Sequence, residues 1–439
     1  MLGLGIVCVI SAAAWCYLVA AHGGFWLTNQ RLPRGARPAP EAWPPVAAVV
    51  PARNEAESLP VTLPALLAQD YPGDFRVFVV DDNSDDGTGA SAAELGEKAA
   101  RDGGAPLTVV QGQPRPDGWA GKVWAMAQGF AAATRTSAST SVLPEYVLFT
   151  DADISWAPRA LSDLVRSAEV DDRGLVSQMA LLRAETRWER VIVPAFVYFF
   201  AQLYPFRKVN DPQSRTAGAA GGCMLIKRSA LEGAGGLEKI KGALIDDVAM
   251  GTLLKRHGNR TWLGLTTDIR SARPYPDLAS LWHMIARSAY VQLKYNPLLL
   301  VGTIIGLLVL YVAPVAGTIT ALIAAVAGST GAAVVLTGAA GLFGWALMTA
   351  SYVPMLRLYG LSPFRAPTLP LIAALYAAMT ADSARRHYSG RAVSWRGRTA
   401  ARVLAMLGRG VLYWPAWVGR ECVGEGRSKN PFWIRVLTY

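Results

Sequence analysis

The sequence is poor in cysteine and histidine. Its 439 residues include four of each. Cys8 and Cys16 lie in an apolar N-terminal stretch, whereas Cys223 and Cys422 stand alone, so no spacing is typical of a disulfide framework or a zinc site. We therefore expect a reducing compartment, and we exclude small disulfide-bonded secreted domains and structural zinc proteins.

Two long stretches lack charged side chains altogether. Residues 1–21 form the first, and residues 295–356, a run of 62 residues, form the second. The second run is long enough for two membrane spans of about 20 residues each, with a break at residues 328–331. Buried helices of a soluble fold are the alternative, but so long a run argues against them.

The first uncharged stretch could be a cleaved signal peptide or a retained anchor. It lacks a basic start, and the first cations, Arg31, Arg34 and Arg37, all follow it. This order favours a retained anchor whose C-terminal side lies in the cytoplasm.

The net charge of +11 is concentrated near the C-terminus. Residues 382–439 hold eleven Lys and Arg against three acidic residues. Such a balance could indicate nucleic-acid binding, but these cations lie beside apolar runs and are interleaved with tryptophans. This pattern is typical of an anionic membrane surface, so we predict a membrane partner and no nucleic acid.

Between the apolar stretches, short apolar strands alternate with helices. Strands are predicted at 46–50, 76–80, 107–110, 146–150 and 221–226, and the pattern is less regular after residue 170. Continuous apolar strands separated by helices indicate an α/β domain with a mostly parallel sheet.

The predicted organisation follows from these patterns. Residues 366–381 are short for a span, and a crossing there would place the basic tail outside the cytoplasm. The segments are a transmembrane anchor (1–22), a linker (23–45), an α/β domain (46–277), an interfacial helix (278–296), a transmembrane hairpin (297–356), an interfacial or re-entrant segment (366–381) and a basic amphipathic tail (382–439).

Acidic residues follow the predicted strands. Asp81 and Asp82 end one strand, and Asp151 and Asp153 follow another. Ligands of parallel sheets collect at the carboxyl ends of the strands. Carboxylate oxygens there suit Mg²⁺ or Mn²⁺, which bind one or two carboxylates together with substrate phosphates.

Six motifs occur in a fixed order. They are VPARNE (50–55), VVDDNSDDGT (79–88), GK (121–122), DAD (151–153), GGC (221–223) and DD (246–247). The series resembles the family 2 glycosyltransferases with a GT-A fold, over roughly residues 45–290. The stretch PRPDGWAGKVWAM (114–126) and the tail SARR (383–386) with WRGR (395–398) are similar to the hopene-associated glycosyltransferases of bacterial hopanoid clusters.

The resemblance implies a role for each motif. Nucleotide binding is implied for Pro51, Arg53, Asn54, Glu55, Asp81, Asp82, Lys122, Asp151 and Arg287. Metal coordination is implied for Asp151 and Asp153, contact with the donor sugar or the acceptor for Gly222, Cys223 and Asp246, and general-base catalysis for Asp247. Each motif alone also fits a structural role, such as a helix cap, a turn or a solvated lysine.

Arg287 departs most from the family pattern. It corresponds to the arginine of the Gln-x-x-Arg-Trp signature of processive synthases, but Met284 and Ser288 replace the glutamine and the tryptophan. The loss of the tryptophan argues against a polymer threaded from the site. Asp246 is a second departure, since glutamate is usual there.

The expected activity is an inverting sugar transfer from a nucleotide sugar, with UDP favoured, to a lipid acceptor. The resemblance implies a role in hopanoid metabolism. By resemblance, the enzyme would lie in the bacterial inner membrane with several spans and a cytoplasmic catalytic domain. A polyprenyl-phosphate glycosyltransferase is one alternative. A membrane transport or scaffold protein with a degenerate nucleotide-binding domain is another, although all its acidic motifs are intact.

Overall fold

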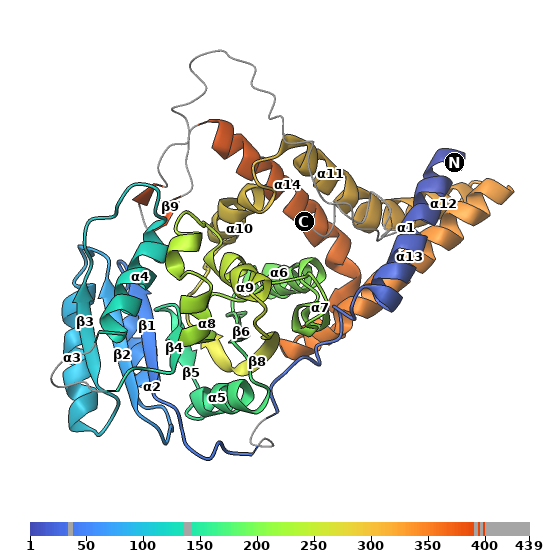
Figure 1. The fold of residues 1–439 in the computed structure, drawn as a ribbon. Coiled ribbons are helices and arrows are strands. Elements are labelled where there is room, and N and C mark those ends of the chain that lie inside the picture. The colour runs from blue at the N-terminus through green and yellow to red at the C-terminus, as the bar shows by residue number, and fades with distance from the viewer. Residues whose placement is uncertain (34–37, 136–141, 390–393, 396–397, 400–439) are drawn as a thin grey trace, which may run out of the picture.

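A mixed sheet of eight strands forms the centre of the α/β part of the chain (Figure 1). The computed structural model describes residues 1–33, 38–135, 142–389, 394–395 and 398–399. The strands are β1 (Val46–Ala52), β2 (Phe75–Asp81), β3 (Leu107–Gln111), β4 (Tyr146–Phe149), β5 (Ile154–Trp156), β6 (Leu175–Leu181), β7 (Met224–Lys227) and β8 (Thr261–Ser271). Their order is β3-β2-β1-β4-β7-β6-β8-β5.

The sheet is parallel in its first half and mixed in its second. The pairs β3–β2, β2–β1, β1–β4 and β6–β8 are parallel, whereas β4–β7, β7–β6 and β8–β5 are antiparallel. The predicted α/β class with a mostly parallel sheet is confirmed. Strands β5, β6 and β8 were not predicted, and they take part in all but one of the pairs in the mixed half.

Helices cover both faces of the sheet because the strand side chains alternate in direction. Val46 and Ala48 of β1 face one apolar cluster, and Ala47 and Val49 face the other. The first cluster includes α2 (Leu59–Leu67), α3 (Thr88–Arg101) and α5 (Ala160–Val170), and the second includes α4 (Gly121–Ala133), α8 (Arg228–Gly233) and α9 (Asp246–Arg256).

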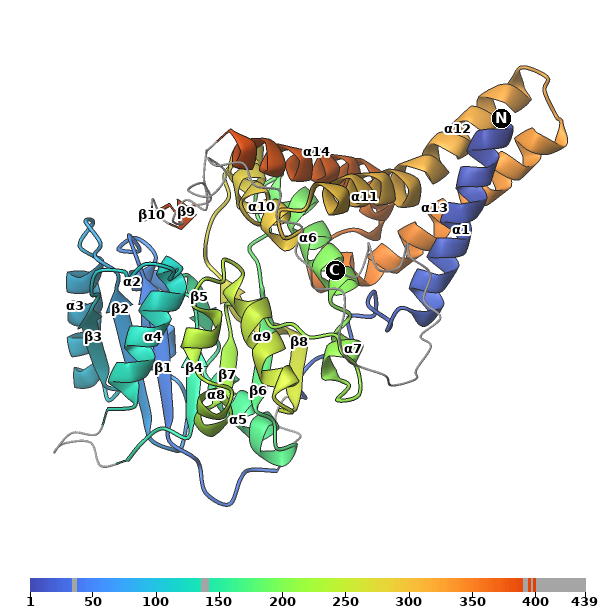
Figure 2. The same ribbon diagram turned by 45° about the horizontal axis from the view of Figure 1, so that its top comes forward.

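A second body of helices (Figure 2) packs around an apolar cluster that also includes Met179 of β6 and Leu263 and Leu265 of β8. Its helices are α1 (Leu2–Ala21), α6 (Glu189–Leu203), α7 (Phe206–Asn210), α10 (Leu278–Gln292), α11 (Pro297–Leu307), α12 (Ala313–Val326), α13 (Ala332–Leu358) and α14 (Leu369–Tyr388). Figure 2 shows α1, α12 and α13 extending together away from the sheet.

Three helical stretches among the described residues are long and apolar enough to cross a membrane. They are Leu2–Ala21, Pro297–Val326 and Ala332–Leu358. The segment predicted at 366–381 begins in a 3-10 helix (Pro363–Thr368) and continues into α14, which packs beside α10 and α11. The predicted amphipathic tail lies outside the described residues from residue 400 onward.

A π-helical turn holds α1 to the hairpin. The turn, Leu308–Val312, joins α11 to α12, and its Leu310 carbonyl accepts hydrogen bonds from Trp15 Nε1 at 2.8 Å and Ser11 Oγ at 3.2 Å. Carbonyls released by a π-turn need such partners in an apolar environment. The N-terminal helix is therefore fixed by polar contacts as well as by packing.

Close packing of α4 on the sheet predicts a strict need for glycine at position 129. A Cβ there would lie 2.4 Å from Val49 Cγ1 and 2.8 Å from Val80 Cγ2. We expect Gly129→Ala to lower the free energy of unfolding by about 1–3 kcal/mol through overpacking. Gly233→Ala, where nothing lies within 4 Å of the added Cβ, is the matched control in denaturant unfolding. Equal stability of both variants would contradict this account.

Candidate active site

The sheet topology brings the predicted motifs to one edge. Strands β2, β1 and β4 are adjacent and parallel, so the segments after them begin at the same edge. Strand β7 runs antiparallel to β4, with Met224 opposite Phe149. The residues that precede β7 therefore meet those that follow β4, and the 221–223 motif joins the acidic motif at 151–153.

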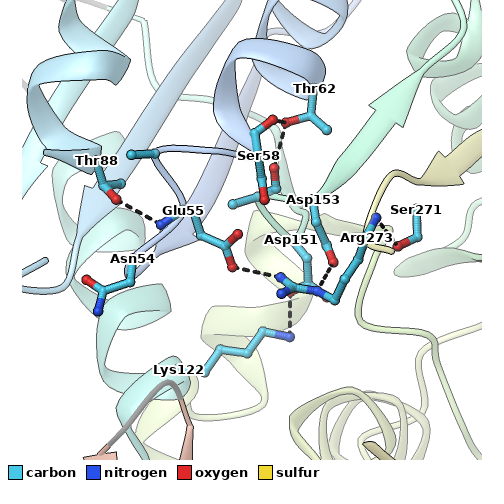
Figure 3. Close-up of polar contacts among 12 residues, drawn as sticks. Asn54, Glu55, Ser58, Thr62, Thr88, Lys122, Asp151, Asp153, Ser271 and Arg273 are labelled. Atoms are coloured by element: carbon cyan, nitrogen blue, oxygen red, sulfur yellow. Dashed lines mark hydrogen bonds and ion pairs between the residues drawn. The ribbon is translucent and has the colours of Figure 1, made fainter. Parts of the chain in front are cut away.

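Backbone-to-side-chain bonds tie the loops after β1 and β2 together (Figure 3). The amide of Glu55 donates to Thr88 Oγ1 at 2.8 Å, and that of Asn54 to Ser84 Oγ at 3.0 Å. The Arg53 guanidinium donates to the Asp82 carbonyl. Asn54 has a φ of 51°, a left-handed conformation that asparagine tolerates better than most residues. These bonds fix the entrance of the site before any ligand binds.

Lys122 lies at the start of α4, near the carboxylates of Asp151, Asp246 and Asp247. Its Nζ is 2.7 Å from Asp151 Oδ1 and 3.0 Å from Asp246 Oδ2. Burial favours the neutral amine, but the charges of Asp151 and Asp246 outweigh it and raise the pKa of Lys122. The lysine is therefore a permanent cation at this edge, as required for binding a diphosphate.

Asp247 lies in the first turn of α9 and is held by two backbone amides. Gly221 N–H donates to Oδ2 at 2.9 Å, and Val248 N–H to Oδ1 at 2.7 Å. Burial and the adjacent Asp246 raise the pKa of Asp247 to about 6. A fixed carboxylate with a pKa near neutrality has the properties of a general base.

The site contains one cationic side chain, Arg273, that the sequence did not predict. Arg273 follows β8 and bridges two motifs, with Nε 2.6 Å from Asp153 Oδ2 and Nη2 2.8 Å from Glu55 Oε1 (Figure 3). Both carboxylates are largely buried. The signal was hard to find because β8 was not predicted, so nothing indicated that residue 273 reaches this edge.

Other predicted site residues lie apart from these ion pairs. Arg287 is exposed on α10, and the Cys223 side chain is fully buried in the core, where burial raises its thiol pKa to about 12. Gly222 accepts a hydrogen bond from Thr150 Oγ1 at 2.8 Å. Pro51 lies within β1, and Asp81, at the end of β2, accepts from the Ser84 amide at 2.9 Å.

The carboxylates fit a divalent cation in chemistry but do not form a closed metal cage. Among the described residues, no three His, Cys, Asp or Glu side chains converge as a metal site. Mg²⁺ and Mn²⁺ need only one or two carboxylates when substrate phosphates complete the coordination. Asp151 and Asp153 are hard oxygen donors on a short segment after β4, so they suit such an ion.

Removing Arg273 tests whether it balances these carboxylates. Arg273→Gln should lower the free energy of unfolding by about 1–3 kcal/mol, because Glu55 and Asp153 lose their counter-ion. Added Mg²⁺ should then raise the melting temperature of this variant more than that of the wild type. Arg270→Gln is the control, since Arg270 is exposed on β8. An equal response to Mg²⁺ in both variants would contradict the assignment.

The chain is similar to known proteins in sequence family and in fold. Residues 47–235 match the family described as "Glycosyl transferase family 2". The mannosyltransferase PcManGT from Pyrobaculum calidifontis, solved in complex with GDP-Man and Mn²⁺, is similar with 20% identity and a TM-score of 0.50, over 88% of this chain and 99% of that one. No curated protein matches the chain in sequence.

A second structure is similar over a smaller region. Mannosyl-3-phosphoglycerate synthase from Rubrobacter xylanophilus matches with 20% identity and a TM-score of 0.35, over 57% of this chain and 75% of that one. The matched family segment includes nearly all of strands β1 to β7 and the site residues up to Cys223, whereas Asp246, Asp247 and Arg273 lie beyond it. Residues 47–235 therefore match the family 2 glycosyltransferases, the fold is GT-A, and the chain is a glycosyltransferase.

Proposed function

We propose that this enzyme is a membrane-bound inverting glycosyltransferase that moves a sugar from a nucleotide sugar to a lipid acceptor. The observation that carries the proposal is the Asp247 carboxylate, held by two amides and raised in pKa, beside the cation of Lys122. A base and a diphosphate-binding cation at one edge are what a direct displacement requires.

In the proposed reaction, Asp247 accepts the proton of the acceptor hydroxyl while that oxygen forms a bond with the anomeric carbon. The bond from that carbon to the diphosphate breaks on the opposite face, and Lys122 stabilises the negative charge that develops on the diphosphate. Inversion follows from this single displacement. A Mg²⁺ or Mn²⁺ ion held by Asp151 and Asp153 would supply further charge neutralisation to the diphosphate.

The apolar helices support a lipid acceptor. Figure 2 shows α10 and α14 on the side toward which β1, β2 and β4 end, next to the helices that could cross a membrane. A cytoplasmic catalytic domain on the bacterial inner membrane fits this arrangement and the cations that follow α1. The resemblance of residues 114–126 to the hopene-associated glycosyltransferases favours a hopanoid alcohol over a polyprenyl phosphate as the acceptor.

The donor nucleotide is a finer part of the proposal. We favour UDP, and the binding of GDP-Man by the mannosyltransferase PcManGT makes GDP-mannose the first alternative to test. Asp81 and Asp82 could accept hydrogen bonds from the base and the ribose.

The Asp247 assignment predicts a loss of rate without a loss of donor binding. Asp247→Asn should lower turnover about 10²–10⁴-fold, because a positioned base is removed. Product is measured by mass spectrometry of extracted lipids, with a hopanoid alcohol and a polyprenyl phosphate offered in parallel. In the wild type, kcat/KM should fall as the pH drops through about 6, since the base acts only when deprotonated. Normal turnover of the variant would refute this role.

Chelation tests the metal. EDTA should abolish donor binding in the wild type, and Mn²⁺ should restore it, because Lys122 and Arg273 are already paired with carboxylates and a diphosphate needs the further charge of the ion. Asp153→Ala should weaken Mn²⁺ binding, measured by electron paramagnetic resonance of the free ion. Donor affinity that survives chelation would show a cation-independent site instead.

A further inference from the structure

A groove between α10 and α14 lies outside the catalytic cluster. It has a volume of about 430 Å³ and is lined by Leu278, Ala279, Trp282, His283 and Arg386. The first three residues supply an apolar wall, and the last two supply hydrogen-bond donors. A groove that combines these features suits an amphipathic anion.

Asp382 organises the polar side of the groove. Its carboxylate accepts from Trp282 Nε1 at 2.9 Å, from Arg386 Nε at 2.7 Å, and from Arg385 at 2.6 and 2.9 Å. Only 12% of the Asp382 side chain is exposed. Two guanidinium groups thus share one carboxylate, which leaves one net positive charge in the network.

The His283 ring is oriented by the same network. Arg386 Nη1 lies 2.6 Å from His283 Nδ1. A guanidinium can only donate, so Nδ1 accepts, and the ring proton lies on Nε2. His283 is exposed, so its Nε2–H can donate to a ligand. Arg386 uses Nε and Nη1 within the network, and its Nη2 group can donate as well.

We propose that this groove binds the phosphate of an anionic lipid headgroup. Arg386 Nη2 and His283 Nε2 hold the phosphate oxygens, and Leu278 and Trp282 pack against the adjoining apolar atoms. Charged guanidinium donors suit phosphate, and tryptophan is typical of the headgroup level of a membrane. The inference rests on the proposed membrane location, because α10 leads into the apolar stretch Pro297–Val326.

Native mass spectrometry of the full chain in detergent tests the site with phosphatidylglycerol as the probe. Arg386→Gln should weaken the lipid adduct about tenfold, because a charge-assisted contact with phosphate is lost. Arg385→Gln is the matched control, since Arg385 pairs with the same Asp382 but does not line the groove. It should keep the adduct. Equal adducts in both variants would overturn the proposal.

Two further arms make the result decisive. His283→Phe keeps an aromatic ring but removes the Nε2 donor, so it should weaken the adduct several-fold even if Arg386→Gln does not fold. Inorganic phosphate at about 10 mM should not displace the lipid, and displacement would make this a site for soluble phosphate. Sugar transfer to lipid is measured in parallel. Sugar transfer without a lipid adduct that depends on Arg386 and His283 refutes only the groove as a lipid site. Such an adduct without sugar transfer to lipid refutes only the proposed function.

Discussion

The structure depends on the concentration of carboxylates at one edge of a sheet. Glu55, Asp151, Asp153 and Asp246 would repel each other, and Lys122 and Arg273 pair with them. Each cation bridges motifs from different elements. Lys122 and Arg273 can also pair with a diphosphate, and Asp151 and Asp153 with a divalent ion, so the charges that stabilise the edge suit the proposed ligands.

The mixed half of the sheet serves this edge. Because β7 is antiparallel to β4, the segment before it lies beside Lys122, and a Cβ at Gly221 would approach Lys122 Nζ to 3.1 Å and Asp247 Oδ2 to 3.5 Å. A side chain at position 221 would therefore crowd Lys122, whereas glycine leaves its amide free to donate to Asp247. Strand β8 is followed by Arg273, which lies at the same edge. The chain then enters α10 of the helical body.

Two helices of the helical body lie near the catalytic edge. Helices α10 and α14 lie beside each other on the side toward which the catalytic strands end, and each is close in sequence to a helix that could cross a membrane. The polar network around Asp382 and the catalytic ion pairs are separate, so variants of one need not disturb the other.

The sequence by itself determined the first four strands, the helices that begin at Lys122 and near Asp247, and the apolar stretches. These features are local, because apolar periodicity, glycine turns and acidic residues are patterns among neighbouring positions of the sequence. The tertiary structure alone decided strands β5, β6 and β8, the antiparallel pairing of β7, the burial of Cys223 and the position of Arg273 beside Asp153 and Glu55. Those outcomes depend on which distant segments pair, and pairing between residues 55, 153 and 273 leaves no periodic signal in a single sequence.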